Sequence, residues 1–232
     1  MNVAIIPARG GSRRIARKNI RPFRGRPIIG WSIEAALESG CFDRVIVSTD
    51  EEEIAEVAIQ FGAQVPFMRP PELSDDRTGT VPVIGHAIEW LESGGEHVDL
   101  ACCIYATAPF LQPGDLREGQ NALLASDCDY AFSVTSYAFP IQRALRLGDD
   151  GGVEMFWPEH CTTRSQDLEA AYHDAGQFYW GRPGAWKAGR AIFGLRSRPV
   201  MIPRHRVQDI DTLEDWTRAE WMFAAMREEA AQ

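Results

Sequence analysis

A chain of 232 residues, with 45% hydrophobic and 25% charged residues, has an ordinary globular composition and can bury a core as one domain. Its formal net charge of -9 argues against a protein that coats nucleic acid or an anionic membrane. No apolar run reaches membrane-spanning length, and the amino-terminal run is too short for a signal peptide. The five cysteines show no disulfide framework. We therefore expect a cytoplasmic protein with neither nucleic-acid nor membrane partners.

Apolar runs and amphipathic segments alternate along the first 130 residues. The apolar runs, which are bounded by turn formers, predict strands over residues 2–7, 44–49, 63–68 and 100–106. Helical spacing between them predicts helices over residues 27–40, 50–62, 80–95 and 113–126, with Asp50 as the N-cap of the second and Gly40 as the C-cap of the first. This order predicts an α/β fold, in which a Rossmann-like, mostly parallel sheet carries helices on both faces.

The pattern changes between about residues 133 and 163. Strand-like pieces at 141–147 and 153–157 flank a Gly-Asp turn and predict a β-hairpin excursion from a single domain of residues 1–232. Aromatic side chains on such an excursion are typical of a homodimer contact, and a lid over the site is the alternative. The chain then returns through strands at 175–180 and 198–203 and ends in a helix from Thr212 to about Glu229.

A dense group of positive charges follows the first strand. Eight of the chain's 24 Lys and Arg residues lie between Arg9 and Arg26, with no acidic residue among them. The loops after parallel strands meet at the carboxyl edge of the sheet, where open α/β sheets bind ligands. Gly10 and Gly11 let the backbone approach a ligand and present consecutive N–H groups, and Ser12 adds a hydroxyl. The loop therefore predicts a polyphosphate site, and a solvated basic loop is the alternative.

The segment QDIDT, from Gln208 to Thr212, is the second strong pattern. Asp209 and Asp211 are two residues apart, so an extended backbone points both carboxylates to the same face. They repel one another unless a cation lies between them, and Mg²⁺ is typically bound by one or two carboxylates together with phosphate oxygens. The pair predicts an Mg²⁺ site. Alternatively, Asp211 is the N-cap of the final helix, with Glu214 as its capping-box partner.

Together these motifs resemble a known family. The segments IIPARGGSRRIARKNIRPF, VIVSTD and RPPELSDD are similar to the CMP-sialic-acid-type cytidylyltransferases, and the likeness covers nearly the whole chain. Within that group, YATAPFL, FPIQRAL and YHDAGQFYWG look most like the pseudaminic acid cytidylyltransferases. Tyr105, Leu111 and Gln142 depart from the pattern of the sialic acid enzymes, which favours a differently decorated sugar acid.

The resemblance implies a nucleotidyltransferase that transfers CMP from CTP to the anomeric hydroxyl of a keto-sugar acid and releases pyrophosphate. Two alternatives remain open. One is a synthetase for another sugar acid, namely N-acetylneuraminate, legionaminate or Kdo. The other is a non-catalytic nucleotide-binding protein, against which the acidic pair argues, because binding alone does not need both carboxylates.

The resemblance also implies roles for single residues. Arg9, Lys18 and Asp211 are the expected catalytic residues, and Asp209 and Asp211 are the expected ligands of Mg²⁺, the cofactor that accompanies CTP. The expected CTP contacts are Ala8, Arg9, Gly10, Gly11, Ser12, Lys18, Asn19, Arg69, Thr78 and Thr80. The expected contacts of the sugar acid, whose carboxylate needs a cation such as Arg143 or Arg164, are Asn19, Tyr105, Gln142, Arg143, Arg164, Tyr172, His173 and Gln177.

Overall fold

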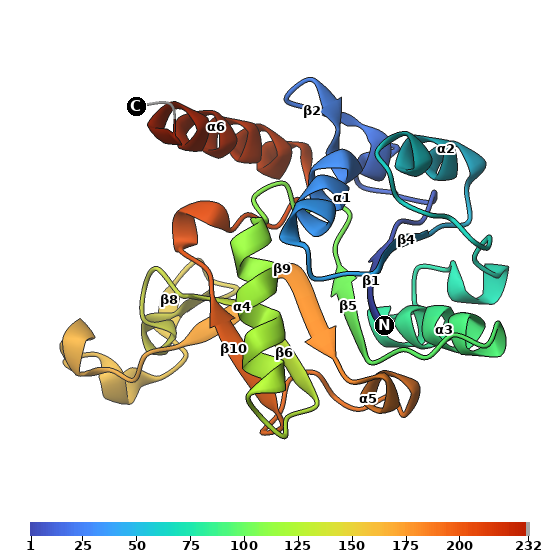
Figure 1. The fold of residues 1–232 in the computed structure, drawn as a ribbon. Coiled ribbons are helices and arrows are strands. Elements are labelled where there is room, and N and C mark those ends of the chain that lie inside the picture. Colours follow the sequence, from blue (N-terminus) through green and yellow to red (C-terminus); the bar gives the residue numbers. More distant parts are fainter. Residues whose placement is uncertain (231–232) are drawn as a thin grey trace.

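The computed structural model describes residues 1–230, which are built around a six-stranded sheet of order β10-β6-β9-β5-β1-β4 (Figure 1). Its strands are β1 (Asn2–Pro7), β4 (Arg44–Ser48), β5 (Leu100–Ile104), β6 (Tyr130–Ser136), β9 (Tyr172–Gly181) and β10 (Ser197–Met201). β9 runs antiparallel to both of its neighbours, and the other strand pairs are parallel. The predicted mostly parallel sheet is confirmed.

Helices cover both faces of this sheet. Successive residues of a strand point to opposite faces, and the side chains on both faces are apolar. Ala4 and Ile6 of β1 belong to the core under α1, α2 and α4, whereas Val3 and Ile5 belong to the core under α3 and α5. These helices are α1 (Ile28–Ser39), α2 (Glu52–Gln60), α3 (Thr80–Ser93), α4 (Pro113–Leu124) and α5 (Pro183–Lys187). Burial on both faces explains why the strands of this sheet read as unbroken apolar runs.

The carboxyl-terminal helix α6 (Leu213–Ala230) packs on the segment that follows the basic loop (Figure 1). Trp216 and Phe223 each contact Phe23 edge-on, with 5.5 Å between ring centroids in both pairs. This aromatic cluster fixes the start of α6 near the basic loop. The remaining elements are β2 (Pro22–Phe23), β3 (Arg26–Pro27) and the 3-10 turns Lys18–Ile20, Pro71–Leu73, Ile141–Arg143, Pro158–His160, Ser165–Asp167 and Arg204–Arg206.

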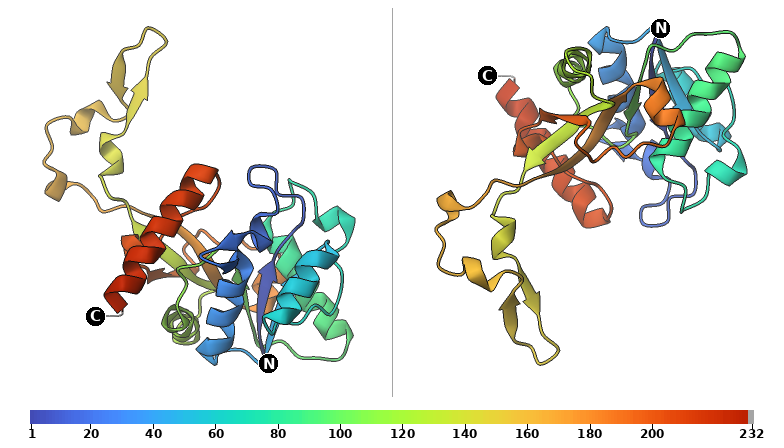
Figure 2. Two further views of the ribbon diagram at one scale, coloured as in Figure 1. Left: turned by 90° about the horizontal axis from the view of Figure 1, so that it is seen from above. Right: turned by 90° about the horizontal axis from the view of Figure 1, so that it is seen from below.

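Residues 137–171 form an arm that projects away from the sheet and its helices (Figure 2). β7 (Leu145–Leu147) and β8 (Val153–Met155) pair antiparallel in the arm, at the place where the sequence predicts a hairpin. None of residues 137–171 is buried. The arm therefore has no core of its own.

Some expectations for the elements are wrong. Residues 63–68 do not form a strand, because Pro66 lacks an N–H for a ladder, and only Gln64 and Met68 make single parallel bridges to the strand β4 and the residue after it. Asp50 does not cap α2, whose N-cap is Glu51 without a side-chain hydrogen bond. The strand β6 was also missed by the sequence analysis. Its apolar residues continue into the arm without a break that would mark the end of a strand.

Within residues 1–230, no helix combines the length and the apolar character needed to cross a lipid bilayer.

Candidate active site

A cavity of about 580 Å³ opens at the carboxyl edge of β1 and β5. Its walls come from the loop after β1, the segment 69–83, the residues after β5 and Asp211 just before α6. Nine of the expected site residues line it, namely Arg9, Ser12, Lys18, Asn19, Arg69, Thr78, Thr80, Tyr105 and Asp211. The topology therefore brings together segments that are up to 200 residues apart in the chain.

Cations of the basic loop form one wall of the cavity, and two carboxylates hold them. Arg14 pairs with Asp211 at 2.8 Å, and the ammonium of Lys18 lies 3.5 Å from the same carboxylate. Arg9 and Arg13 both pair with Asp76, which lies shortly after the 3-10 turn Pro71–Leu73. This wall therefore carries four cations, namely three guanidinium groups and one ammonium group. Such a wall suits the oxygens of a polyphosphate.

Three of the other four cations of the loop make contacts that support the fold. Arg17 pairs with Glu53 on α2. Arg21 lies over the ring of Trp216, 5.3 Å from its centroid, and Arg26 stacks on Trp31 at 3.4 Å. The loop's positive charge is thus divided between the cavity and cation–π contacts that anchor the loop to α1 and α6.

The expected nest of backbone N–H groups is wrong. The N–H of Gly10 donates to the Asp50 carboxylate at 2.9 Å, and the N–H of Ser12 donates to the carbonyl of Gly10 at 2.8 Å. A Cβ at Gly10 would lie 1.9 Å from the carboxylate of Glu51, so a larger residue there requires the Glu51 side chain to move. Neither Gly10 nor Gly11 lines the cavity, whose cationic wall is made by side chains. Ala8 is buried, and Gly11 is exposed outside the cavity wall.

The opposite wall is polar and carries one buried cation, Arg69. The Tyr105 hydroxyl lies 3.4 Å from the hydroxyl of Thr80, and burial raises the pKa of Tyr105, so its phenol stays protonated. Arg69 is buried and donates to the Ser48 carbonyl at 2.7 Å, while burial lowers the pKa of its guanidinium. This wall offers hydrogen-bonding groups of fixed position beside the cationic wall, as a site for a polar ring with attached phosphates requires.

Asp211 faces the cavity and does not cap α6. The hydroxyl of Thr212 accepts the N–H of Asp215 at 3.2 Å, while the Asp215 carboxylate accepts the N–H of Thr212 at 2.8 Å. This reciprocal capping box excludes the alternative in which Asp211 and Glu214 begin the helix. Partial burial, followed by the charge of Asp211, raises the pKa of Asp209, so the two carboxylates lie close enough to repel one another.

The structure does not bring the other expected sugar contacts to this cavity. Three of them lie on the arm and make contacts within it. Gln142 donates to the Glu169 carbonyl at 3.0 Å, Arg143 donates to the Thr163 carbonyl, and Arg164 pairs with Asp167. None of the three lines the cavity, and the arm that carries them extends away from the sheet (Figure 2).

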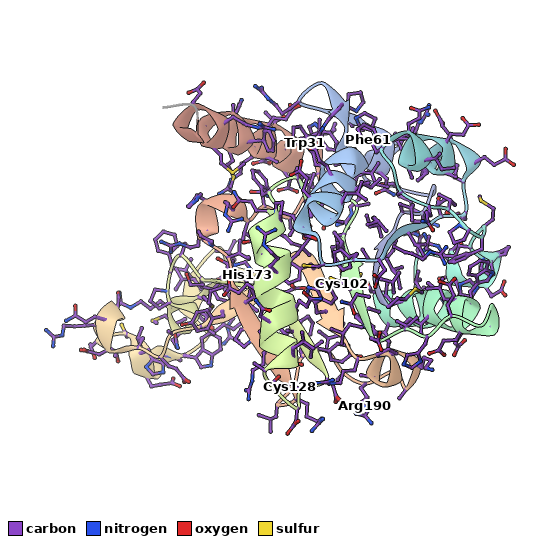
Figure 3. The ribbon with its side chains drawn as sticks, in the orientation of Figure 1. Trp31, Phe61, Cys102, Cys128, His173 and Arg190 are labelled. Carbon is purple, nitrogen blue, oxygen red and sulfur yellow. The ribbon has the colours of Figure 1, made fainter. Side chains whose placement is uncertain are left out.

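The last three lie on β9. Tyr172 is exposed, and His173 (Figure 3) packs against Tyr137 of the arm with 4.8 Å between ring centroids. Gln177 is buried, and its amide donates to the backbone carbonyl of Arg206 at 2.6 Å. Its Oε1 atom is also buried and has no hydrogen-bond partner among residues 1–230, so the assignment of Gln177 to the sugar acid stays a prediction.

Sequence reasoning missed several residues of the cavity wall. They are Pro7, Arg13, Arg14, Asp76, Gly79, Val83, Ala106 and Thr107. The density of positive charge pointed to the loop without telling Arg13 and Arg14 from their neighbours. The signal available for Ala106 and Thr107 was their position directly after a buried strand, where ligand-binding loops of open sheets begin.

A doubly covered, mostly parallel sheet with a cationic cavity at its carboxyl edge defines a nucleotide-binding α/β protein. The sequence model for cytidylyltransferases matches residues 3–179. The chain is 45% identical to the pseudaminic acid cytidylyltransferase of Campylobacter jejuni over 229 residues, which cover 99% of each protein. It therefore belongs to the cytidylyltransferase family, and the resemblance seen in the sequence motifs is confirmed.

More distant proteins fit this assignment. The chain is 37% identical to N-acylneuraminate cytidylyltransferase A of Danio rerio over 220 residues, which cover 94% of this chain and 49% of that protein. A solved CMP:2-keto-3-deoxy-manno-octonic acid synthetase, complexed with CTP, superposes with a TM-score of 0.70 at 17% identity and covers 97% of this chain and 99% of its own. That likeness shows the fold shared with a nucleotidyltransferase.

Proposed function

We propose that this enzyme transfers CMP from CTP to the anomeric hydroxyl of pseudaminic acid and releases pyrophosphate. The observation that carries the proposal is the cavity itself, in which four cations of the basic loop face a polar wall of hydroxyl groups and the Arg69 guanidinium. The full-length similarity to the Campylobacter jejuni enzyme supports pseudaminic acid as the sugar acid. In the reaction, the sugar oxygen bonds to the α-phosphorus, the bond to the bridging oxygen breaks with its electrons on pyrophosphate, and the hydroxyl proton passes to water.

The basic loop supplies the electrostatic part of this chemistry. Arg9 and Lys18 would hold the phosphate oxygens and stabilise the charge that develops on the departing pyrophosphate. Asn19 donates to the carbonyl of Arg9 at 2.9 Å, which holds the loop backbone beside the phosphates. Thr80 and Tyr105 would contact the uncharged part of the nucleotide or the sugar.

Asp209 and Asp211 would hold Mg²⁺ together with phosphate oxygens. The pair fits the ion, because burial and then the charge of Asp211 raise the pKa of Asp209, and a cation between the two carboxylates relieves their repulsion. Across residues 1–230, no three His, Cys, Asp or Glu side chains gather into a metal cage of their own. When bound, the ion would neutralise the α-phosphate and lower the pKa of the attacking hydroxyl.

We also propose that the arm joins two copies in a homodimer. It carries large apolar side chains that water surrounds, among them Phe139 and Leu147, with 82% and 81% of their surfaces exposed. A hairpin without a core is marginal in water and gains stability by burying this surface against a partner. We place the reaction in the cytoplasm, where the five cysteines, all free thiols in the structure, stay reduced.

One experiment tests the proposed reaction. Each nucleoside triphosphate is incubated with a panel of keto-sugar acids, and pyrophosphate release is measured with and without Mg²⁺. We expect release with CTP and pseudaminic acid in the presence of Mg²⁺. Release with ATP or GTP, or without a sugar acid, contradicts the proposal. Release with N-acetylneuraminate, legionaminate or Kdo instead identifies another sugar acid, and CTP binding without any release identifies a non-catalytic protein.

A further inference from the structure

Asp76 is bound by two of the cations that line the cavity. Its carboxylate accepts a hydrogen bond from Nη1 of Arg9 and pairs with Nη2 of Arg13. The side chains of Arg9 and Asp76 are 35% and 32% exposed, so this pair lies in the cavity wall and is only partly screened by solvent. The hydrogen bond from Arg9 lowers the pKa of Asp76, so the carboxylate is ionised at neutral pH. The wall expected to hold phosphate already holds an anion from the protein.

A different carboxylate maintains the turn that carries Asp76. Asp75 accepts the N–H of Arg77 at 3.0 Å, the N–H of Thr78 at 2.6 Å and the hydroxyl of Thr78 at 2.6 Å. These bonds close the turn without a contribution from the Asp76 side chain. Asp76 is thus free to leave Arg9 by rotation of its side chain, while Thr78 keeps its place in the cavity wall.

We propose that Asp76 competes with the phosphate groups of CTP, and with the leaving pyrophosphate, for Arg9 and Arg13. This inference rests on the proposed function, because it requires a polyphosphate in the cavity. A guanidinium presents its donors in one planar fork, so a carboxylate and a phosphate that claim the same edge exclude one another. The competition weakens the binding of polyphosphate, and the Asp76 ion pairs re-form when pyrophosphate departs.

Asp76 differs in this respect from Asp211, the other carboxylate of the cavity. Asp211 lies beside a second carboxylate, Asp209, which gives the pair the character of a cation site. The carboxylate next to Asp76 belongs to Asp75, and one of its oxygens accepts the three hydrogen bonds that close the turn. The contacts of Asp76 therefore assign it to the arginines rather than to a metal.

The test is a comparison of pyrophosphate and CTP binding by isothermal titration calorimetry for the wild type, Asp76→Asn and Glu72→Gln. Glu72 is the matched control, because it is an exposed acid of the same segment and its carboxylate makes no ion pair with any of residues 1–230. We expect Asp76→Asn to bind pyrophosphate about two- to fivefold more tightly than the wild type, the range for loss of a partly exposed competing ion pair. Pyrophosphate should also inhibit its turnover at correspondingly lower concentrations.

The control should bind pyrophosphate as the wild type does. Binding by Asp76→Asn that equals or falls below that of Glu72→Gln overturns the proposal, and weaker binding identifies Asp76 as a group that helps to hold the ligand. Failure of the wild type to bind CTP refutes the proposed function itself, which separates the two ideas.

Discussion

Arg206 donates two hydrogen bonds to Asp115, at 2.6 and 2.9 Å, three residues before the acidic pair begins at Asp209. Both side chains are buried, with 11% and 10% of their surfaces exposed. Asp115 also closes the capping box at the start of α4 by accepting the N–H of Gln112. Gln177 of β9 donates to the carbonyl of Arg206. The acidic segment is therefore tied to a helix end and to the sheet.

Asp115→Asn should lower both stability and turnover. The substitution leaves the Arg206 guanidinium buried without a carboxylate, which typically costs about 3–5 kcal/mol of unfolding free energy. We expect a lower kcat as well, because the acidic segment loses one of its two supports. Urea unfolding and pyrophosphate release measure the two effects.

The control for that variant is Asp129→Asn, which breaks the ion pair between a comparably buried carboxylate and the exposed Arg196 at the opposite edge of the sheet. It should lose stability while keeping its kcat. Equal loss of kcat in both variants, per mole of folded protein, shows that the Arg206 pair has no special role in placing the acidic segment.

Asp211→Ala should reduce turnover by at least about a hundredfold, the usual effect of removing a group that stabilises transition-state charge. The fold should survive, because Thr212 and Asp215 form the capping box of α6 without Asp211. Glu214→Ala removes the same charge from an exposed position three residues further on and serves as the control. Steady-state pyrophosphate release and thermal melting report the result, and normal Mg²⁺-dependent turnover removes Asp211 from the mechanism.

Stability should depend on pH through Asp129. Hydrogen bonds from Arg196 and then Arg190 lower the pKa of this carboxyl in the folded protein. A lowered pKa contributes stability that is complete above the unfolded pKa, near 4, and is lost as the pH falls through the folded pKa. The difference in melting temperature between wild type and Asp129→Asn should stay constant from about pH 7 to pH 5 and shrink below about pH 4. A difference that grows on acidification contradicts this account.

Leu147→Asp on the arm should convert the proposed homodimer into a monomer, because a charge at the centre of an apolar contact is costly to bury. Leu195→Asp is the matched control, since Leu195 is a fully exposed leucine on a loop outside the arm. Size-exclusion chromatography with light scattering measures the mass of each variant. A wild type that is monomeric at micromolar concentration, or a Leu147→Asp variant that stays dimeric, refutes the role of the arm.

Local pattern predicted the parts of the fold that depend on near neighbours along the chain. Helix α1 ends at Ser39, with Gly40 as the C-cap in the left-handed conformation that glycine tolerates. Strand β1 and the loop after it lie as predicted at the carboxyl edge, because right-handed crossovers leave little choice for a βαβ order. The sequence alone thereby located the basic loop and Asp211 in one site.

Tertiary packing decided what each side chain does within that frame. Arg13 and Arg17 lie in the same loop, yet one faces the cavity and the other pairs with Glu53, because the neighbours that select them come from distant segments. Gly10 gives its N–H to Asp50 for the same reason. The sequence by itself determined the family, the sheet and the position of the site. Only the folded structure assigned the charges to their partners and showed that the arm carries Arg143 and Arg164 away from the cavity, because long-range contacts leave no periodic trace in a single sequence.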